Sequence, residues 1–254
     1  MLAQSLTRLS PDIVVHTAGL TSVEVCERDP ALAREVNAEL ARNVAVAAVA
    51  TGTQLIHIST DHLFAGANSL YREDAAPEPL NAYARSKLLA EQWVARAAPG
   101  ALIVRTNFFG WGHRYRQSFS DWIYYNLGAG KALTMFDDVF VTPILADELA
   151  LISHRLIELG ASGIYNVVGD ERLSKYDFAV RLAEAYAFPK ALLRRGKITA
   201  SQLFAPRPPD MSLDNRKARE RLGTALGNIT EYLRLLQEQD RAGRRGELLA
   251  AITE

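Results

Sequence analysis

Tyr83 and Lys87 carry the clearest chemical signal in the sequence, because a phenol and an ammonium stand four residues apart. On a helix, residues with this spacing lie on one face. A free phenol has a pKa near 10, and a neighbouring positive charge favours its ionised form. Such a tyrosine can give or take a proton near neutral pH, which carbonyl reduction requires. We therefore predict that this pair does acid–base chemistry.

A second tyrosine–lysine pair with the same spacing, Tyr186 and Lys190, is a weaker candidate. Pro189 stands between the two residues and would interrupt the helix that must align them. The spacing alone is common by chance, so the context of each pair decides between them. The context favours Tyr83 and Lys87.

Two hydroxyl side chains, Ser59 and Thr60, follow the predicted strand at 55–58. The carboxyl ends of parallel strands are where open α/β sheets bind ligands. A hydroxyl at this position can hold a substrate carbonyl, and a turn or helix-cap role accounts for it equally well. Together with Tyr83 and Lys87, Thr60 makes a plausible catalytic triad.

The elements that must position these residues alternate between strand and helix. Short apolar strands separated by helices predict a parallel sheet covered on both faces. After Gly110 the pattern becomes less regular and richer in aromatic residues. The predicted strands are 13–16, 55–58, 101–104, 132–136 and 163–168, and the predicted helices are 30–48, 81–97, 146–159, 176–187 and 229–239.

Seven segments resemble successive motifs of the extended short-chain dehydrogenases/reductases, and they are most similar to the dTDP-4-dehydrorhamnose reductase-like (RmlD-like) branch. The resemblance covers almost the whole chain. The segments are His-Thr-Ala-Gly at 16–19, Val-Asn at 36–37, Ile-Ser-Thr-Asp-His-Leu-Phe at 58–64, Pro-Leu-Asn-Ala-Tyr through Lys at 79–87, Arg-Thr-Asn at 105–107, Gly-Ile-Tyr-Asn-Val-Val-Gly at 163–169, and Arg-Pro leading to Leu-Asp within 207–214.

The resemblance implies an α/β fold with an NAD(P)-binding, Rossmann-like, doubly wound parallel sheet. Residues 1–110 would form a partial dinucleotide-binding core, interleaved with later segments. Residues 111–254 would form mainly a smaller α/β substrate-binding region. The implied activity is reduction of a 4-keto nucleotide sugar by NADPH or NADH.

The resemblance also implies a role for particular residues. Thr60 would hydrogen-bond the sugar ketone and Tyr83 would protonate its oxygen. Lys87 would lower the pKa of Tyr83, and both Tyr83 and Lys87 would contact the cofactor. The other residues implied are Ala18, Gly19, Thr21 and Thr106 for the cofactor, and Phe108 and Arg207 for the nucleotide sugar.

One expected feature is absent at the start of this sequence. A dinucleotide-binding fold opens with a strand, a glycine-rich phosphate turn and a helix, but the first glycine here is Gly19, after the strand at 13–16. A βαβ unit needs about 30 residues, more than precede that strand. We therefore expect an N-terminally incomplete sheet whose first strand is an unprotected edge.

Two functional alternatives remain open. A non-catalytic, nucleotide-sugar-binding or regulatory relative would keep the fold without cofactor binding. An epimerase would share the tyrosine and the lysine. A dehydratase is disfavoured because His62, not a second acidic residue, follows Asp61.

Composition excludes several other classes. The chain has 29 basic and 29 acidic residues, so it lacks the positive surplus that nucleic acid and anionic membranes attract. No apolar run is long enough to span a membrane. The single cysteine, Cys26, cannot form an intramolecular disulfide, and no cluster has metal-ligand spacing. We expect a cytoplasmic protein without a metal, and the sequence leaves a homo-oligomer open.

Overall fold

The fold is built around a parallel sheet of four strands in the order β1-β2-β3-β8. A computed structural model describes residues 2–113, 115–200 and 203–250. Most residues in the strands are apolar, as buried parallel strands require. The first three strands lie within one residue of their predicted bounds. The strands are β1 (Ile13–His16), β2 (Gln54–Ile58), β3 (Leu102–Arg105) and β8 (Gly163–Asn166).

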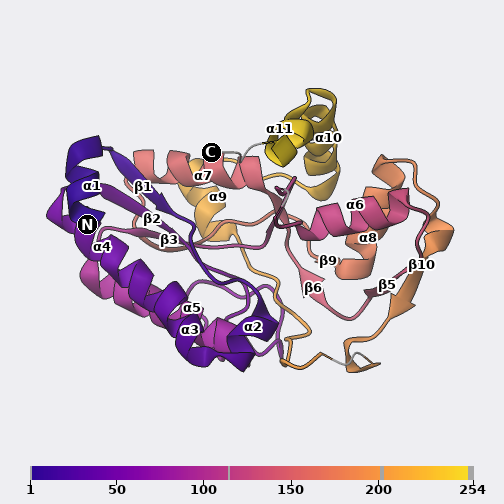
Figure 1. Ribbon diagram of the computed structural model, residues 1–254, viewed down its shortest axis with the longest axis horizontal. Coiled ribbons are helices and arrows are strands. Elements are labelled where there is room, and N and C mark those ends of the chain that lie inside the picture. Colours follow the sequence, from indigo (N-terminus) through magenta and orange to yellow (C-terminus); the bar gives the residue numbers. More distant parts are fainter. Residues whose placement is uncertain (1, 114, 201–202, 251–254) are drawn as a thin grey trace.

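Helices cover both faces of this sheet (Figure 1). Leu55 and Ile103 pack towards the helices α4 and α5, whereas Ile56, Leu102 and Val104 pack towards α7 and α9. The alternation of strand side chains between two apolar layers defines a doubly wound α/β sheet. The covering helices are α4 (Leu40–Ala50) and α5 (Ala82–Ala97) on one face, and α7 (Ala146–Glu158) and α9 (Arg216–Leu222) on the other.

The helix predicted at 30–48 is not uniform. It consists of α3 (Pro30–Arg34), one π-helical turn η1 (Glu35–Glu39) and α4. Asn37 lies in the π turn, where its side chain accepts a hydrogen bond from the Leu20 amide (2.7 Å) and donates one to Ser86 Oγ (2.9 Å). The turn therefore fastens the loop after β1 to α5.

Helix α5, which carries Tyr83 and Lys87, begins at a strong cap. The Asn81 side chain accepts a hydrogen bond from the Ala84 amide (2.9 Å), as an N-cap does. Its amide group also donates to the carbonyl of Pro206 (2.9 Å). The cap thus ties the start of α5 to a segment far along the chain.

The remaining elements form a second, less regular part that lies on the right in Figure 1. It contains three two-stranded pairs, of which β4–β7 and β5–β10 are parallel and β6–β9 is antiparallel. The strands are β4 (Phe108–Phe109), β5 (Leu133–Phe136), β6 (Phe140–Val141), β7 (Ile144–Leu145), β9 (Leu173–Ser174) and β10 (Leu193–Gly196), and the helices are α6 (Phe119–Gly128), α8 (Lys175–Ala185), α10 (Ile229–Arg241) and α11 (Arg244–Ala250). The chain also has α1 (Leu2–Leu9), α2 (Val23–Arg28) and the 3₁₀ turns η2 (Lys190–Leu192) and η3 (Ile198–Ala200).

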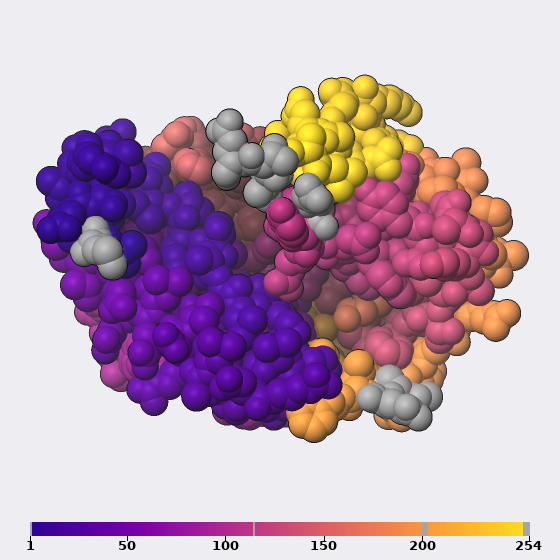
Figure 2. Space-filling model, viewed as in Figure 1, coloured from indigo at the N-terminus to yellow at the C-terminus, as the bar shows by residue number. Residues whose placement is uncertain are grey.

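The sheet edge and the boundary between the two parts both leave surface open. Strand β1 is the edge of the four-stranded sheet, and its Val15 is 39% exposed. In the space-filling view the surface is hollowed where the indigo and purple part meets the magenta and orange part (Figure 2). This hollow is the place to look for a site.

Candidate active site

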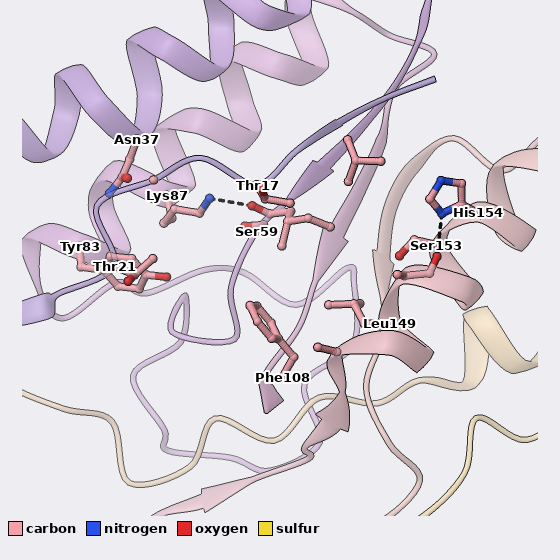
Figure 3. A pocket seen from close by; sticks show the side chains of 15 residues that line it. Thr17, Thr21, Asn37, Ser59, Tyr83, Lys87, Phe108, Leu149, Ser153 and His154 are labelled. Carbon is pink, nitrogen blue, oxygen red and sulfur yellow. Dashed lines mark hydrogen bonds between the residues drawn. The ribbon is translucent and has the colours of Figure 1, made fainter. Parts of the chain in front are cut away.

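Tyr83 and Lys87 lie together on the wall of a cavity of about 270 Å³. Helix α5 brings both side chains to it, and they are only 8% and 6% exposed. The Lys87 ammonium donates a hydrogen bond to the carbonyl of Ile58 at the end of β2 (2.7 Å; Figure 3). Tyr83 and Lys87, which the sequence predicts to act together, thus line the same cavity at the carboxyl end of the sheet.

The other walls of this first cavity come from three different elements. Thr17, Gly19 and Thr21 lie in the loop after β1, and Phe108 belongs to β4. Helix α7 closes the opposite side with side chains that include Leu149 (Figure 3). Most of the surface area that lines this cavity is apolar, so the cavity suits a largely apolar group.

A second cavity of about 560 Å³ shares Tyr83 and Phe108 with the first one. Thr60 and Thr106 line only the second cavity. The hydroxyl of Thr106 is buried and has no hydrogen-bond partner among the described residues. Since buried polar groups are normally paired, this hydroxyl is available to a ligand. Tyr83 therefore stands between two spaces that could hold two reactants.

The Tyr83 phenol is held in its neutral form. Burial raises the pKa of Tyr83 to about 12, while an interaction with the Thr60 hydroxyl opposes the rise. Burial also lowers the pKa of Lys87 to about 8, and the charge of Glu91 opposes that change. The net shift of the Tyr83 pKa is upward, and Lys87, expected to lower it, is not among the groups that contribute to the shift. The Lys87 ammonium donates to the Ile58 carbonyl.

Asp61 and His62 place two further titratable groups beside Tyr83. Burial raises the pKa of Asp61 to about 7, although the Asn107 amide donates a hydrogen bond to its carboxylate (2.7 Å). Burial lowers the pKa of His62 to about 3, so its imidazole is neutral. The His62 ring lies edge-on to Tyr83, with centroids 5.6 Å apart. From the sequence, these two residues were part of the motif at 58–64 and argued against dehydration, but neither was assigned a catalytic or binding role.

A third cavity of about 450 Å³ adjoins the second and is basic. Arg207 and Lys175 line it, and His62 lines both cavities. One guanidinium nitrogen of Arg207 pairs with Glu24 (2.9 Å), and another is buried without a partner among the described residues. The unpaired donor and the lysine suit an anionic group such as a phosphate.

The structure brings together most of the residues that the sequence singled out. Gly19, Thr21, Tyr83 and Phe108 line the first two cavities, and Lys87 lines the first of them. Thr60 and Thr106 line the second cavity, and Arg207 lines the third. Ala18 is apart, because it lines a different cavity between α1, β1 and α4.

Asn37 is a site residue to which sequence reasoning assigned no role. It lines the first cavity and holds the backbone of Leu20 through two hydrogen bonds, and a Cβ added at Gly19 would lie 3.0 Å from its oxygen. Its place within the Val-Asn motif was the available signal. Its function as a clamp depends on the π turn, which has no sequence pattern of its own.

Other kinds of site receive no support from the residues that the structure describes. Among them, no group of three or more His, Cys, Asp or Glu side chains could hold a metal ion. In the same residues, no helix has both the length and the apolar character needed to cross a membrane.

A doubly wound parallel sheet, with a tyrosine and a lysine one helical turn apart at its carboxyl edge, defines the class of extended short-chain dehydrogenases/reductases. The family model described as the RmlD substrate binding domain matches residues 1–241. The chain therefore belongs to this family. The predicted family and the predicted α/β fold are both confirmed.

Relatives within this family differ in what they do. The chain is 29% identical over 241 residues to the probable low-salt glycan biosynthesis reductase Agl14 of Haloferax volcanii, covering 93% of this chain and 80% of that protein. It is also 29% identical to methionine adenosyltransferase 2 subunit beta of Xenopus tropicalis, covering 87% of this chain and 67% of that protein. The family thus includes reductases and a subunit of another enzyme.

Among solved structures, the fold is similar to that of dTDP-4-dehydrorhamnose reductase from Bacillus anthracis, which was solved in complex with NADP. The TM-score is 0.87 and the sequence identity is 25%. The match covers 94% of this chain and 84% of that one.

Proposed function

We propose that the protein reduces the 4-keto group of a nucleotide sugar, with NADPH or NADH as the reductant. The observation that carries this proposal is the position of Tyr83 as a neutral phenol between two cavities, with Thr60 beside one and Lys87 beside the other. A neutral phenol is the form of tyrosine that can protonate a ketone oxygen.

The residues present fit the nicotinamide end of such a cofactor. Most of the surface that lines the first cavity is apolar, and its polar groups include Asn37, Ser59, Tyr83 and Lys87. Gly19 contributes no side chain to it. The bound cofactor would supply a hydride to the ketone carbon. Tyr83 and Lys87 would hold the nicotinamide ribose, with Thr21 nearby. Thr106, which the sequence assigned to the cofactor, lines the second cavity and would face the sugar instead.

The sugar nucleotide fits the second and third cavities. Thr60 would orient the ketone oxygen, and Tyr83 would donate its proton to that oxygen as the alcohol forms. Phe108 would separate the sugar from the apolar part of the first cavity. Arg207 and Lys175 would bind the diphosphate through charge-assisted hydrogen bonds. Residues 1–110 would thus mainly bind the cofactor and residues 111–254 mainly the substrate.

Calorimetric titration with NADPH and NADH, each with and without dTDP, tests this proposal. Saturable binding of one dinucleotide, followed by its oxidation when a dTDP-4-keto sugar is added, is the expected result. A folded sample that binds neither dinucleotide would contradict the reductase proposal for this polypeptide.

The comparison with methionine adenosyltransferase 2 subunit beta favours one alternative, a regulatory subunit that binds a partner enzyme. Co-purification with a methionine adenosyltransferase and a change in its activity would support it. The two functions are separated by Tyr83→Phe, because reduction needs the phenol and binding of a partner enzyme does not.

A further inference from the structure

Glu24 is an acidic residue in the lining of the third cavity, where the diphosphate of a nucleotide sugar was placed above. It belongs to α2, and its side chain is 30% exposed. By charge alone, a carboxylate in this position would repel a phosphate group and weaken its binding. The proposed function assigns no role to Glu24, so its place beside Arg207 and Lys175 calls for another reason.

The Glu24 carboxylate contacts one short segment that lies far along the chain. One of its oxygens accepts a hydrogen bond from Nη2 of Arg207 (2.9 Å). The other oxygen accepts a hydrogen bond from the backbone amide of Ala205 (3.3 Å). The same carboxylate therefore holds the main chain at 205 and the guanidinium that this segment carries.

Other contacts hold the main chain of this segment but leave the guanidinium aside. Ala205 is fully buried in the apolar cluster that contains Tyr83. The carbonyl of Pro206 accepts a hydrogen bond from the Asn81 side chain (2.9 Å). Within the described part of the chain, the hydrogen bonds of the Arg207 guanidinium go to Glu24. The position of this long side chain thus depends on Glu24.

Holding a guanidinium in place before a ligand arrives favours binding. A free arginine side chain has many rotamers, and ordering it costs conformational entropy. When the free protein has already ordered the side chain, this cost does not reduce the affinity for the ligand. Nη2 of Arg207 is bonded to Glu24, whereas Nη1 has no partner among the described residues. The guanidinium therefore keeps donors for a phosphate.

The place of Glu24 on α2 also relates Arg207 to the other two cavities. Thr21, in the loop before α2, lines all three cavities. Ser22 caps α2, and its side chain accepts a hydrogen bond from the Val25 amide (3.3 Å). Glu24 thus stands three residues after a residue that lines every part of the site. Its bond to Arg207 sets where a diphosphate would lie relative to the reacting groups.

We propose that Glu24 is a positioning residue that holds the Arg207 guanidinium ready for the diphosphate of the nucleotide sugar. This inference rests on the proposed reductase function, which places the diphosphate in the third cavity. The Glu24 charge is balanced by the guanidinium that it contacts, so its repulsion of a phosphate is reduced. The benefit of an ordered Arg207 exceeds the repulsion that remains.

The direction of the change in dTDP affinity tests this proposal. Glu24→Gln removes the charge of the contact, and in Glu24→Asp the carboxylate is one methylene too short to make it. We expect both variants to bind dTDP about five- to tenfold more weakly in calorimetry, as for one side chain that the ligand must order itself. A carboxylate that acted only by repulsion would give tighter binding in Glu24→Gln and no change in Glu24→Asp.

Glu171→Gln is the matched control for Glu24→Gln. Glu171 contacts Arg181 at the same distance of 2.9 Å, and its side chain is 31% exposed. It is not among the residues that line the three cavities. We expect this variant to bind dTDP within about twofold of wild type, since surface ion pairs contribute little.

A double-mutant cycle separates positioning from a general effect on the fold. In Arg207→Gln, the side chain that Glu24 holds is gone, so adding Glu24→Gln should no longer weaken dTDP binding. Equal losses in both backgrounds, or dTDP affinity in Glu24→Gln and Glu24→Asp equal to or above that of wild type, would overturn the inference and leave the reductase proposal standing. A folded wild-type protein that binds neither dTDP nor a dinucleotide would overturn both.

Discussion

At the scale of single residues, Tyr83 is the group on which the proposed chemistry depends most directly. Its hydroxyl is the proposed proton donor, whereas its ring belongs to an apolar cluster with Val23 and Cys26 of α2. In Tyr83→Phe the ring remains and the proton is lost. We expect turnover to fall by about 10²- to 10⁴-fold, the usual contribution of a general acid. Binding of dTDP, measured by calorimetry, should change little.

Tyr71→Phe is the matched control for that substitution. The Tyr71 ring stacks on Phe64 with centroids 4.1 Å apart, and its hydroxyl accepts a hydrogen bond from the Asn68 amide, away from the three cavities. It should keep turnover within a fewfold of wild type. Near-normal turnover in Tyr83→Phe would contradict the assigned role.

Asp61 gives a prediction about stability and pH. Burial raises its pKa from 3.8 to about 7 in the folded protein, so folding takes up a proton between about pH 4 and pH 7. The associated stability is present below pH 4 and is lost as the pH rises through 7. The shift corresponds to at most about 4 kcal/mol. Asp61→Asn should therefore gain stability relative to wild type at pH 8 but not at pH 4, measured by urea unfolding.

Asp12→Asn is the control, because Asp12 is exposed and precedes β1. It should change stability by less than about 0.5 kcal/mol at either pH. If Asp61→Asn lost stability at pH 8, the Asp61 carboxylate would be stabilised by its contacts with Asn107, and the assigned pKa would be wrong.

At the scale of elements, a buried ion pair joins α5 to β3. Glu91 and Arg105 form several hydrogen bonds, the shortest salt-bridge distance is 2.8 Å, and their side chains are 3% and 2% exposed. Ser59 donates to the same carboxylate (2.5 Å). The pair therefore holds the residues after β2, which include Thr60, against α5, the helix that carries Lys87.

Removing one partner should destabilise the protein more than removing both. Glu91→Leu leaves the Arg105 guanidinium buried without its partner, and we expect a loss of about 3–5 kcal/mol in urea unfolding. In Glu91→Leu combined with Arg105→Met, apolar side chains of similar size replace the pair and much of that loss should be regained. A double variant less stable than the single one would show that Arg105 stabilises the fold through other contacts.

The same scale shows what sequence patterns can predict. The apolar runs at β1, β2 and β3 and the Asn81 cap gave bounds close to those observed, because each depends on neighbouring residues alone. The sequence predicted none of the two-residue strands in the second part, since such strands are too short for a periodic pattern. The Arg245 guanidinium lies over Trp111 and Tyr124 at 5.2 and 4.9 Å, because α11 packs on α10, and no local sequence pattern predicts such a contact between elements.

At the scale of the whole molecule, the site depends on contacts between segments far apart in the sequence. Tyr83 and Lys87 could be paired from their spacing, because one helix carries both. The stacked rings of His16 and His57 could not, because their contact requires the register of two strands. The Asn81 contact with Pro206 and the Glu24 contact with Arg207 likewise form only when the two parts of the molecule meet.

The Glu24–Arg207 contact leads to a prediction about how the two parts share a ligand. Arg207 retains a buried, unpartnered nitrogen beside Lys175, so a diphosphate placed there would gain a charge-assisted hydrogen bond. Arg207→Gln should weaken dTDP binding by about ten- to hundredfold in calorimetry, as expected for a hydrogen bond to a charged group. Arg195→Gln removes an equal charge from an exposed side chain and should have little effect.

The affinity of the wild-type protein for dTDP should also fall as salt is added, and the affinity of Arg207→Gln should fall less steeply. Equal losses in the two variants would show that dTDP responds only to the overall charge, and would place the diphosphate outside the third cavity.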